Sequence, residues 1–133
     1  MIASGVAIAV AAGNDSANAC TGSPNKVPQA VTVGSTTNTD AMSSFSNFGA
    51  CVDVFAPGSN ITSANYANNT GSSVLSGTSM ASPHVAGALA LLLGQTPGAT
   101  PADLAITLLG DATPGVLTGL GAGSPNALLY TAH

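Results

Sequence analysis

The stretch GTSMASPHVAG, residues 77–87, combines a turn signal with the start of a helix. Gly77 permits a sharp turn because it has no side chain to restrict the backbone. Pro83 is expected in the first helical turn, where a backbone N–H has no helical acceptor. The run that follows, ALALLLG at residues 88–94, is apolar on every face up to its last glycine. This pattern predicts a helix that is buried on all sides and ends at that glycine.

Ser79 is therefore predicted at the start of a buried helix, and two interpretations of this residue are open. Serine is a common helix cap, because its oxygen accepts a hydrogen bond from an unpaired N–H group of the first turn. A nucleophile also suits this position, because the helix dipole and the same N–H groups stabilise an oxyanion. The chemistry of the immediate neighbours alone favours the cap.

The eleven residues of this stretch closely resemble the serine motif of the subtilisin-like serine peptidases. They are most similar to the proteinase K branch and, within it, to aqualysin-like enzymes. A motif of this length is far more specific than a short degenerate pattern. The resemblance implies that Ser79 is the nucleophile of a serine endopeptidase, which cleaves peptide and protein substrates through an acyl-enzyme.

The resemblance covers about residues 6–130 and corresponds to the C-terminal half of a subtilisin-like catalytic domain. It implies an α/β fold with three layers around a parallel sheet, of which residues 1–133 form an incomplete C-terminal portion. The residue pattern also predicts a parallel sheet, since short apolar strands alternate with helices. Strands are expected at 6–12, 30–34 and 52–58, and a loose hairpin at 60–75.

The C-terminal part and the start of the chain give three further expectations. Thr100, Pro101 and Asp103 form the pattern of a capped helix start, and Gly110 is expected to end that helix. An extended segment at 126–130 is expected to dock on the body. The first strand lies close to residue 1, and because a parallel strand has neighbours on both sides, we expect further chain upstream.

The composition excludes several classes of partner. Hydrophobic residues make up 45% of the 133 residues and charged residues 5%, against about 25% charged in ordinary globular chains. The net charge is −4 and Lys26 is the one basic residue, which argues against binding to nucleic acid or an anionic membrane. No apolar run is long enough to span a membrane. The composition suits a secreted, compact enzyme body or a part of one.

Asn14 follows the first predicted strand, at the edge of a parallel sheet where ligands bind. At such a position an asparagine is commonly a turn residue. The resemblance implies instead that the Asn14 side chain donates a hydrogen bond to the developing oxyanion, together with the backbone N–H of Ser79. It also implies that Ala11, Ala12 and Gly13 form one wall of the pocket for the substrate side chain before the cleaved bond.

Two cysteines, Cys20 and Cys51, lack the spacing of a zinc or redox motif. They could be two buried free thiols or a disulfide, which would indicate an oxidising compartment. The resemblance implies a disulfide, because aqualysin-like enzymes carry a cysteine pair at the matching places. It also implies a secreted protein.

Asp53 is expected within a strand, where aspartate is disfavoured. It could be a solvated carboxylate at an edge or a ligand for a hard cation such as calcium. The resemblance implies a structural calcium ion, held by the Asp53 carboxylate and the backbone carbonyls of Pro28 and Ala30.

A serine nucleophile needs a base and a carboxylate that orients it. In the family the acid and the histidine precede the serine, in the N-terminal half, so we expect a partner half that carries both. His84 lies five residues after Ser79, and at about 100° per residue the two side chains point about 140° apart on a helix. His133 is the last residue. Neither histidine is expected to be the base.

The sequence therefore supports two hypotheses. The chain is part of a serine endopeptidase and is inactive by itself, or it is a non-catalytic truncated or split fragment that acts as a calcium-stabilised binding or structural module.

Overall fold

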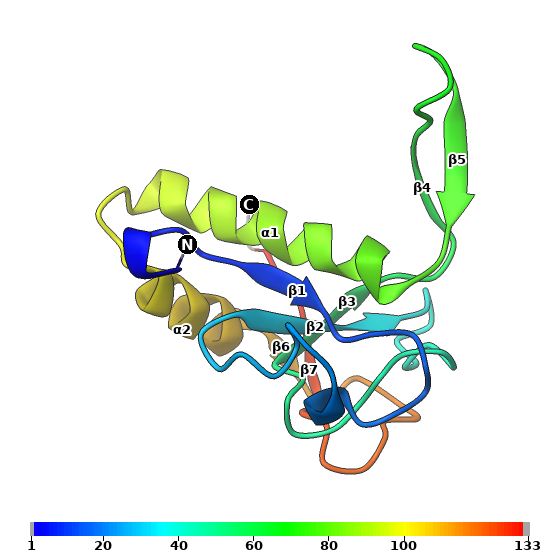
Figure 1. Cartoon of the computed structure of the whole chain (residues 1–133), viewed down its shortest axis with the longest axis horizontal. Coiled ribbons are helices and arrows are strands. Elements are labelled where there is room, and N and C mark those ends of the chain that lie inside the picture. The colour runs from blue at the N-terminus through cyan, green and yellow to red at the C-terminus, as the bar shows by residue number, and fades with distance from the viewer. Residues whose placement is uncertain (1, 132–133) are drawn as a thin grey trace.

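Figure 1 shows the computed structural model of the chain, which describes residues 2–131. A five-stranded sheet has the order β1-β2-β3-β7-β6. Neighbouring strands pair in parallel from β1 to β7, whereas β6 is antiparallel to β7. The strands are β1 (Ala9–Ala11), β2 (Val31–Thr36), β3 (Val54–Pro57), β6 (Thr113–Pro114) and β7 (Ala127–Leu128). The predicted α/β fold with a parallel sheet is confirmed.

The sheet lies between a helical layer and a layer of loops. Helices α1 (Thr78–Gln95) and α2 (Pro101–Asp111) pack on one face, over a core that includes Val33 and Val54. Loops and the short 3-10 helix η2 (Ala19–Thr21) cover the other face, and a second 3-10 helix, η1 (Ile2–Ser4), precedes β1. Phe55 packs on the loop side directly over Gly34, where an added Cβ would lie 2.3 Å from the ring.

Helix α1 differs from the prediction in three ways. It begins at Thr78, so Pro83 is its sixth residue and lies in the second turn rather than the first. It is not buried on all sides, since Leu91 is 50% and Leu93 42% exposed. The reason is that the strands and α2 cover one face of α1, and no described element covers the opposite face. The helix also continues past Gly94 to Gln95.

Strand β1 is shorter and less buried than expected, because it pairs with β2 on one edge only. Val6, which the prediction placed in this strand, is 48% exposed. Strand β3 begins at Val54, so Asp53 lies just before the strand rather than inside it. The Asp53 N–H still donates to the Thr32 carbonyl (2.9 Å), which fixes its position beside β2.

The hairpin, the helix start at Thr100 and the docked tail are confirmed, whereas the end of α2 and strand β6 differ from the prediction. The hairpin consists of β4 (Ile61–Ala64) and β5 (Ser72–Leu75), and it projects from the body (Figure 1). Thr100 and Asp103 form the predicted capping box, although α2 ends at Asp111. Leu128 in the tail pairs with Phe55, whereas β6 was not predicted.

A disulfide joins Cys20 and Cys51 and ties the loop after β1 to the segment before β3. The alternative of two free thiols is thus excluded. No helix in residues 2–131 is both long and apolar enough to cross a membrane.

Candidate active site

The start of α1 presents an exposed serine beside an unpaired N–H group. Gly77 occupies the N-cap position, and its carbonyl accepts hydrogen bonds from the N–H groups of Met80 (2.9 Å) and Ala81 (3.3 Å). Ser79 is the second residue of the helix, so the interpretation of Ser79 as the helix cap is wrong. Its backbone N–H has no acceptor among the described residues.

Asn14 reaches this helix start, and Thr78 fixes the direction of its amide. Both the backbone N and the Oγ1 of Thr78 donate to Asn14 Oδ1, each at 2.8 Å. Because a backbone N–H can only donate, the oxygen of the amide must face Thr78 and the Nδ2 group must point away. Within residues 2–131, Nδ2 has no acceptor, and an added Cβ on Gly77 would lie 3.6 Å from it.

Two unpaired donors thus lie at the positive end of α1, near an exposed hydroxyl group. One is the backbone N–H of Ser79 and the other is Asn14 Nδ2. Donors that are fixed before the reaction stabilise an oxyanion without reorganisation at the moment of reaction. This arrangement is suited to acyl transfer by Ser79. Sequence reasoning missed Thr78, although its position immediately before Ser79 in the motif was a usable signal.

Residues Ala11, Ala12 and Gly13 also lie at this end of the sheet. Gly13 N donates to Thr78 Oγ1 (3.2 Å), which brings the end of β1 against the start of α1. Ala12 is buried, and its N–H donates to the Val33 carbonyl.

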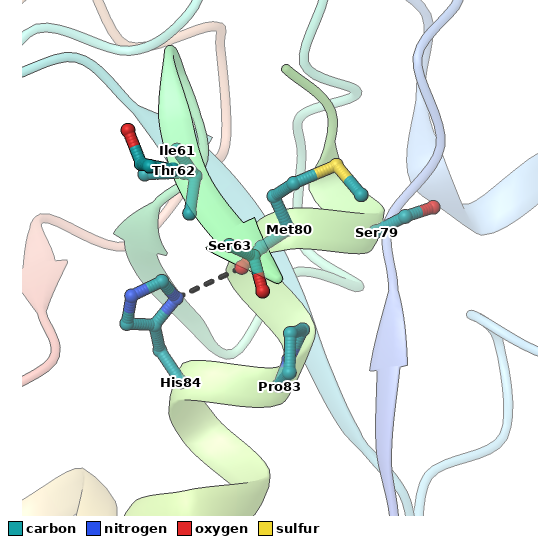
Figure 2. Close-up of a pocket in the computed structure, with 7 residues that line it drawn as sticks. All are labelled: Ile61, Thr62, Ser63, Ser79, Met80, Pro83 and His84. Atoms are coloured by element: carbon teal, nitrogen blue, oxygen red, sulfur yellow. Dashed lines mark hydrogen bonds between the residues drawn. The ribbon is translucent and has the colours of Figure 1, made fainter. Parts of the chain in front are cut away.

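A cavity of about 320 Å³ next to Ser79 lies on the hairpin side, and residues 11–13 do not line it. Figure 2 shows its lining, which the sequence did not predict: Ile61, Thr62, Ser63, Ser79, Met80, Pro83 and His84.

His84 is not placed to act as a general base for Ser79. Its Nδ1 lies 2.8 Å from the Met80 carbonyl oxygen, which can only accept, so Nδ1 carries the proton. Figure 2 shows the Ser79 hydroxyl pointing away from the imidazole ring. His133 lies outside the described residues. Within residues 2–131, no histidine or carboxylate forms a hydrogen bond with the Ser79 hydroxyl.

Asp53 is half-buried, which contradicts the interpretation of a fully solvated carboxylate. Burial raises the pKa of its carboxyl group, and the hydrogen bond from Thr32 N to Oδ2 (2.7 Å) offsets part of this rise. The carbonyl oxygens of Pro28 and Ala30 accept no hydrogen bond from any described residue. These unpaired oxygens are the type of ligand that calcium prefers.

The surroundings limit how strongly a cation could bind. Asp53 and Pro28 line a cavity of about 210 Å³, and Lys26 lines the same cavity, where its charge opposes a cation. Within residues 2–131, no three side chains of the His, Cys, Asp and Glu types cluster around a common point. The donor set therefore fits a calcium ion that takes most of its remaining ligands from water.

Comparison with known proteins gives a consistent result. Residues 1–123 match the sequence profile of the subtilase family. An extracellular serine proteinase from Thermus sp. (strain Rt41A) is 55% identical over 98% of the chain. Alkaline serine exoprotease A from Vibrio alginolyticus is 52% identical over 98% of the chain. The chain spans 32% and 24% of the lengths of these two relatives.

The fold has a close match among solved structures. The crystal structure of a cold-adapted subtilisin-like serine proteinase superposes with a TM-score of 0.95 at 51% sequence identity. The match covers 99% of this chain and 47% of the solved chain.

Proposed function

Because this chain belongs to the subtilase family, we propose that it is the C-terminal portion of a secreted serine endopeptidase catalytic domain, with Ser79 as its nucleophile. One observation carries the proposal: Asn14 Nδ2 and the Ser79 N–H are both unpaired at the start of α1, where the Ser79 hydroxyl is exposed. The names of the Thermus and Vibrio relatives support peptidase chemistry, and the first supports secretion.

The reaction would begin with attack of Ser79 Oγ on the carbonyl carbon of a peptide bond. The serine proton passes to a histidine in the rest of the domain, and the former carbonyl oxygen becomes an oxyanion. Asn14 Nδ2 and the Ser79 N–H donate to that oxyanion. Collapse of the tetrahedral intermediate transfers the proton to the leaving amine and leaves an acyl-enzyme on Ser79. Water then attacks the acyl-enzyme, with the histidine accepting its proton. The second tetrahedral intermediate collapses, releases the carboxylic acid product and returns the proton to Ser79 Oγ.

Ala11, Ala12 and Gly13 would form one wall of the pocket for the substrate side chain before the cleaved bond. Their place at the end of β1, bonded to Thr78 through Gly13, supports this role. The opposite wall would come from the part of the domain that precedes these residues.

A calcium ion would be held by the Asp53 carboxylate and the carbonyls of Pro28 and Ala30. Its role would be structural, since it would neutralise a half-buried charge and join the segment before β2 to the segment before β3. The two carbonyls without hydrogen bonds support this site.

The partner of this chain would be an N-terminal half that carries the catalytic aspartate and histidine. The edge of β1 supports this proposal. Ile8 and Ala12 bond to β2, and alternate residues of a parallel strand bond to opposite edges, so the amides of Ala9 and Ala11 face the free edge. The uncovered face of α1, with Leu91 and Leu93, would be covered by the same partner.

The competing function is a non-catalytic fragment that binds calcium or a partner without peptidase chemistry. Its support is that the Ser79 hydroxyl has no base among the described residues.

Labelling with a fluorophosphonate, followed by peptide mapping to Ser79, separates these possibilities. We expect no labelling of the chain alone, and labelling once it is refolded with an N-terminal half of a subtilisin-like peptidase, here called the assembled domain. The Ser79→Ala variant is the control in both arms. Labelling of the chain alone would show that another base reaches Ser79. Absence of labelling in both arms would favour the non-catalytic fragment.

A further inference from the structure

A buried asparagine side chain bonds to the loop that carries Asn14 on both sides of that residue. Asn47 is 6% exposed, and its Nδ2 donates to the Ala12 carbonyl (2.9 Å). Its Oδ1 accepts from the N–H groups of Asp15 (2.9 Å) and Ala17 (3.0 Å). Its backbone N–H donates to the Gly13 carbonyl (2.9 Å). Asn47 therefore bonds to the chain on both sides of Asn14.

The backbone of this loop needs such a partner. Gly13 has φ +105°, a conformation that takes the chain out of the β1 strand and away from the ladder. A buried backbone group without a partner costs about 1–3 kcal/mol. An asparagine side chain offers both a donor and an acceptor. Asn47 can therefore pair both N–H groups and share the Ala12 carbonyl with Asn25 Nδ2, which donates to it at 2.7 Å. An aspartate could accept from the N–H groups but, when ionised, could not donate to Ala12.

Gly13 and Asn47 are also fitted to each other. A Cβ added at Gly13 would lie 2.3 Å from Asn47 Nδ2, so the amide occupies the space next to the glycine. The two sides of Asn14 are thus held differently. Thr78 fixes the end of its side chain, and Asn47 fixes the backbone from which that side chain extends.

We propose that Asn47 is a positioning residue for the oxyanion site, which sets the backbone of Asn14 so that Nδ2 reaches the developing charge. This inference rests on the proposed function. Among residues 2–131, Asn47 forms no hydrogen bond with Ser79, so we expect it to act through Asn14. Misplacement of a catalytic group by about 1 Å can lower the rate about a hundredfold. Loss of the Asn47 hydrogen bonds on both sides of Asn14 should therefore lower the rate of the chemical step.

The test measures kcat and KM for a peptide substrate in the assembled domain, with Asn47→Ala in the parent and in an Asn14→Ala background. We expect Asn47→Ala to lower kcat about tenfold to a hundredfold in the parent, with KM changed less than about threefold. In the Asn14→Ala background it should lower kcat less than about threefold, because the group that it positions is gone.

Controls separate positioning from stability. Asn126→Ala removes another asparagine that bridges backbone groups, at Leu117, and should leave kcat unchanged. All rates are measured well below each melting temperature. If Asn47→Ala does not fold, Asn47→Asp, which keeps the acceptor, replaces it with the same expectation. Equal losses of kcat in both backgrounds, or no loss in either, would overturn the proposal. An inactive parent that is also not labelled at Ser79 would instead refute the proposed function.

Discussion

Thr78 places two donors on one oxygen of Asn14: its backbone N and its Oγ1 each lie 2.8 Å from Asn14 Oδ1. The contact joins the loop after β1 to the first residue of α1. This contact fixes the orientation of the Asn14 amide. In the flipped orientation, the Asn14 NH₂ group would face the Thr78 backbone N–H, and both groups can only donate. The donor side of Asn14 is thereby fixed before any substrate binds.

The Thr78→Val substitution tests this contact. It keeps the shape and the backbone N–H but removes the hydroxyl that bridges Asn14 Oδ1 and Gly13 N. The remaining N–H still orients the amide, so we expect kcat of the assembled domain to fall by a few-fold to about tenfold, in line with about 0.5–1.5 kcal/mol for one hydrogen bond. Thr107→Val, on the exposed face of α2, is the matched control and should leave kcat unchanged. An unchanged kcat in Thr78→Val would contradict the role of the hydroxyl.

Substitutions of Asn14 should show whether its side chain donates a hydrogen bond to the oxyanion or only supports a turn. Asn14→Ala should lower kcat about 10²–10³-fold with little change in KM. Asn14→Asp should lower it further, because a carboxylate oxygen would then face the oxyanion. Steady-state kinetics of the assembled domain measures both. If Asn14→Asp were as active as the parent, Asn14 would be only a turn residue.

The calcium site predicts that Asp53→Asn is more stable than the parent without calcium and less stable than the parent with calcium. The raised pKa of Asp53 means that its charged form is disfavoured in the fold. Its contribution to stability is present below the unfolded pKa, about 3.9, and is lost as pH rises through the folded pKa. In EDTA at pH 7, Asp53→Asn should therefore melt higher than the parent.

Calcium should reverse that order in the assembled domain. At a concentration 100-fold above Kd, calcium would stabilise the parent by about 2.7 kcal/mol, and the variant by much less. Thermal melting with and without calcium measures this. Equal calcium shifts in parent and Asp53→Asn would place the ion elsewhere.

The capping box of α2 predicts a second, opposite pH dependence. Hydrogen bonds from the hydroxyl and backbone N–H of Thr100 lower the pKa of Asp103. The stabilisation is present above the unfolded pKa of about 3.9 and is lost as pH falls through the folded pKa. An NMR titration of the Asp103 carboxyl carbon should give a midpoint below 3.9, and Thr100→Ala should return it towards that value. A midpoint unchanged by Thr100→Ala would contradict the assignment.

The chain alone should be poorly stable. The free edge of β1 and the exposed apolar residues of α1, such as Leu91 and Leu93, favour association. Sedimentation velocity should show aggregates, and thermal scans should lack a sharp transition until the N-terminal half is added. A monomer with a cooperative unfolding transition would contradict this expectation.

The sequence was most informative where a pattern is local. Thr100 and Asp103 are three residues apart, and their capping box follows from that spacing. The strands at Val31 and Val54 were predicted from short apolar runs. Local pattern also placed Ser79 correctly at the start of a helix, but it misjudged Pro83, because the helix begins at Thr78 and not nearer the proline.

The parts of the site that were missed depend on contacts between distant segments. Asn47 lies 30 residues or more from the groups that its side chain binds, and nothing near it in sequence marks that role. The burial of α1 was also overestimated. An apolar sequence indicates that a helix face is buried, but it does not tell which segment buries it. Leu91 and Leu93 were predicted to be buried, but no segment within residues 2–131 covers them.

The contact between Thr78 and Asn14 spans 64 residues, and this separation has a consequence for biosynthesis. Parallel strands pair through long crossovers and form late in folding, since distant segments must meet first. The two oxyanion donors would therefore come together only when the sheet is nearly complete. A newly made chain would carry its serine without a working active site, and catalytic competence would arrive with the final stages of folding. In the proposed peptidase, an unfinished copy would therefore have no proteolytic activity of its own.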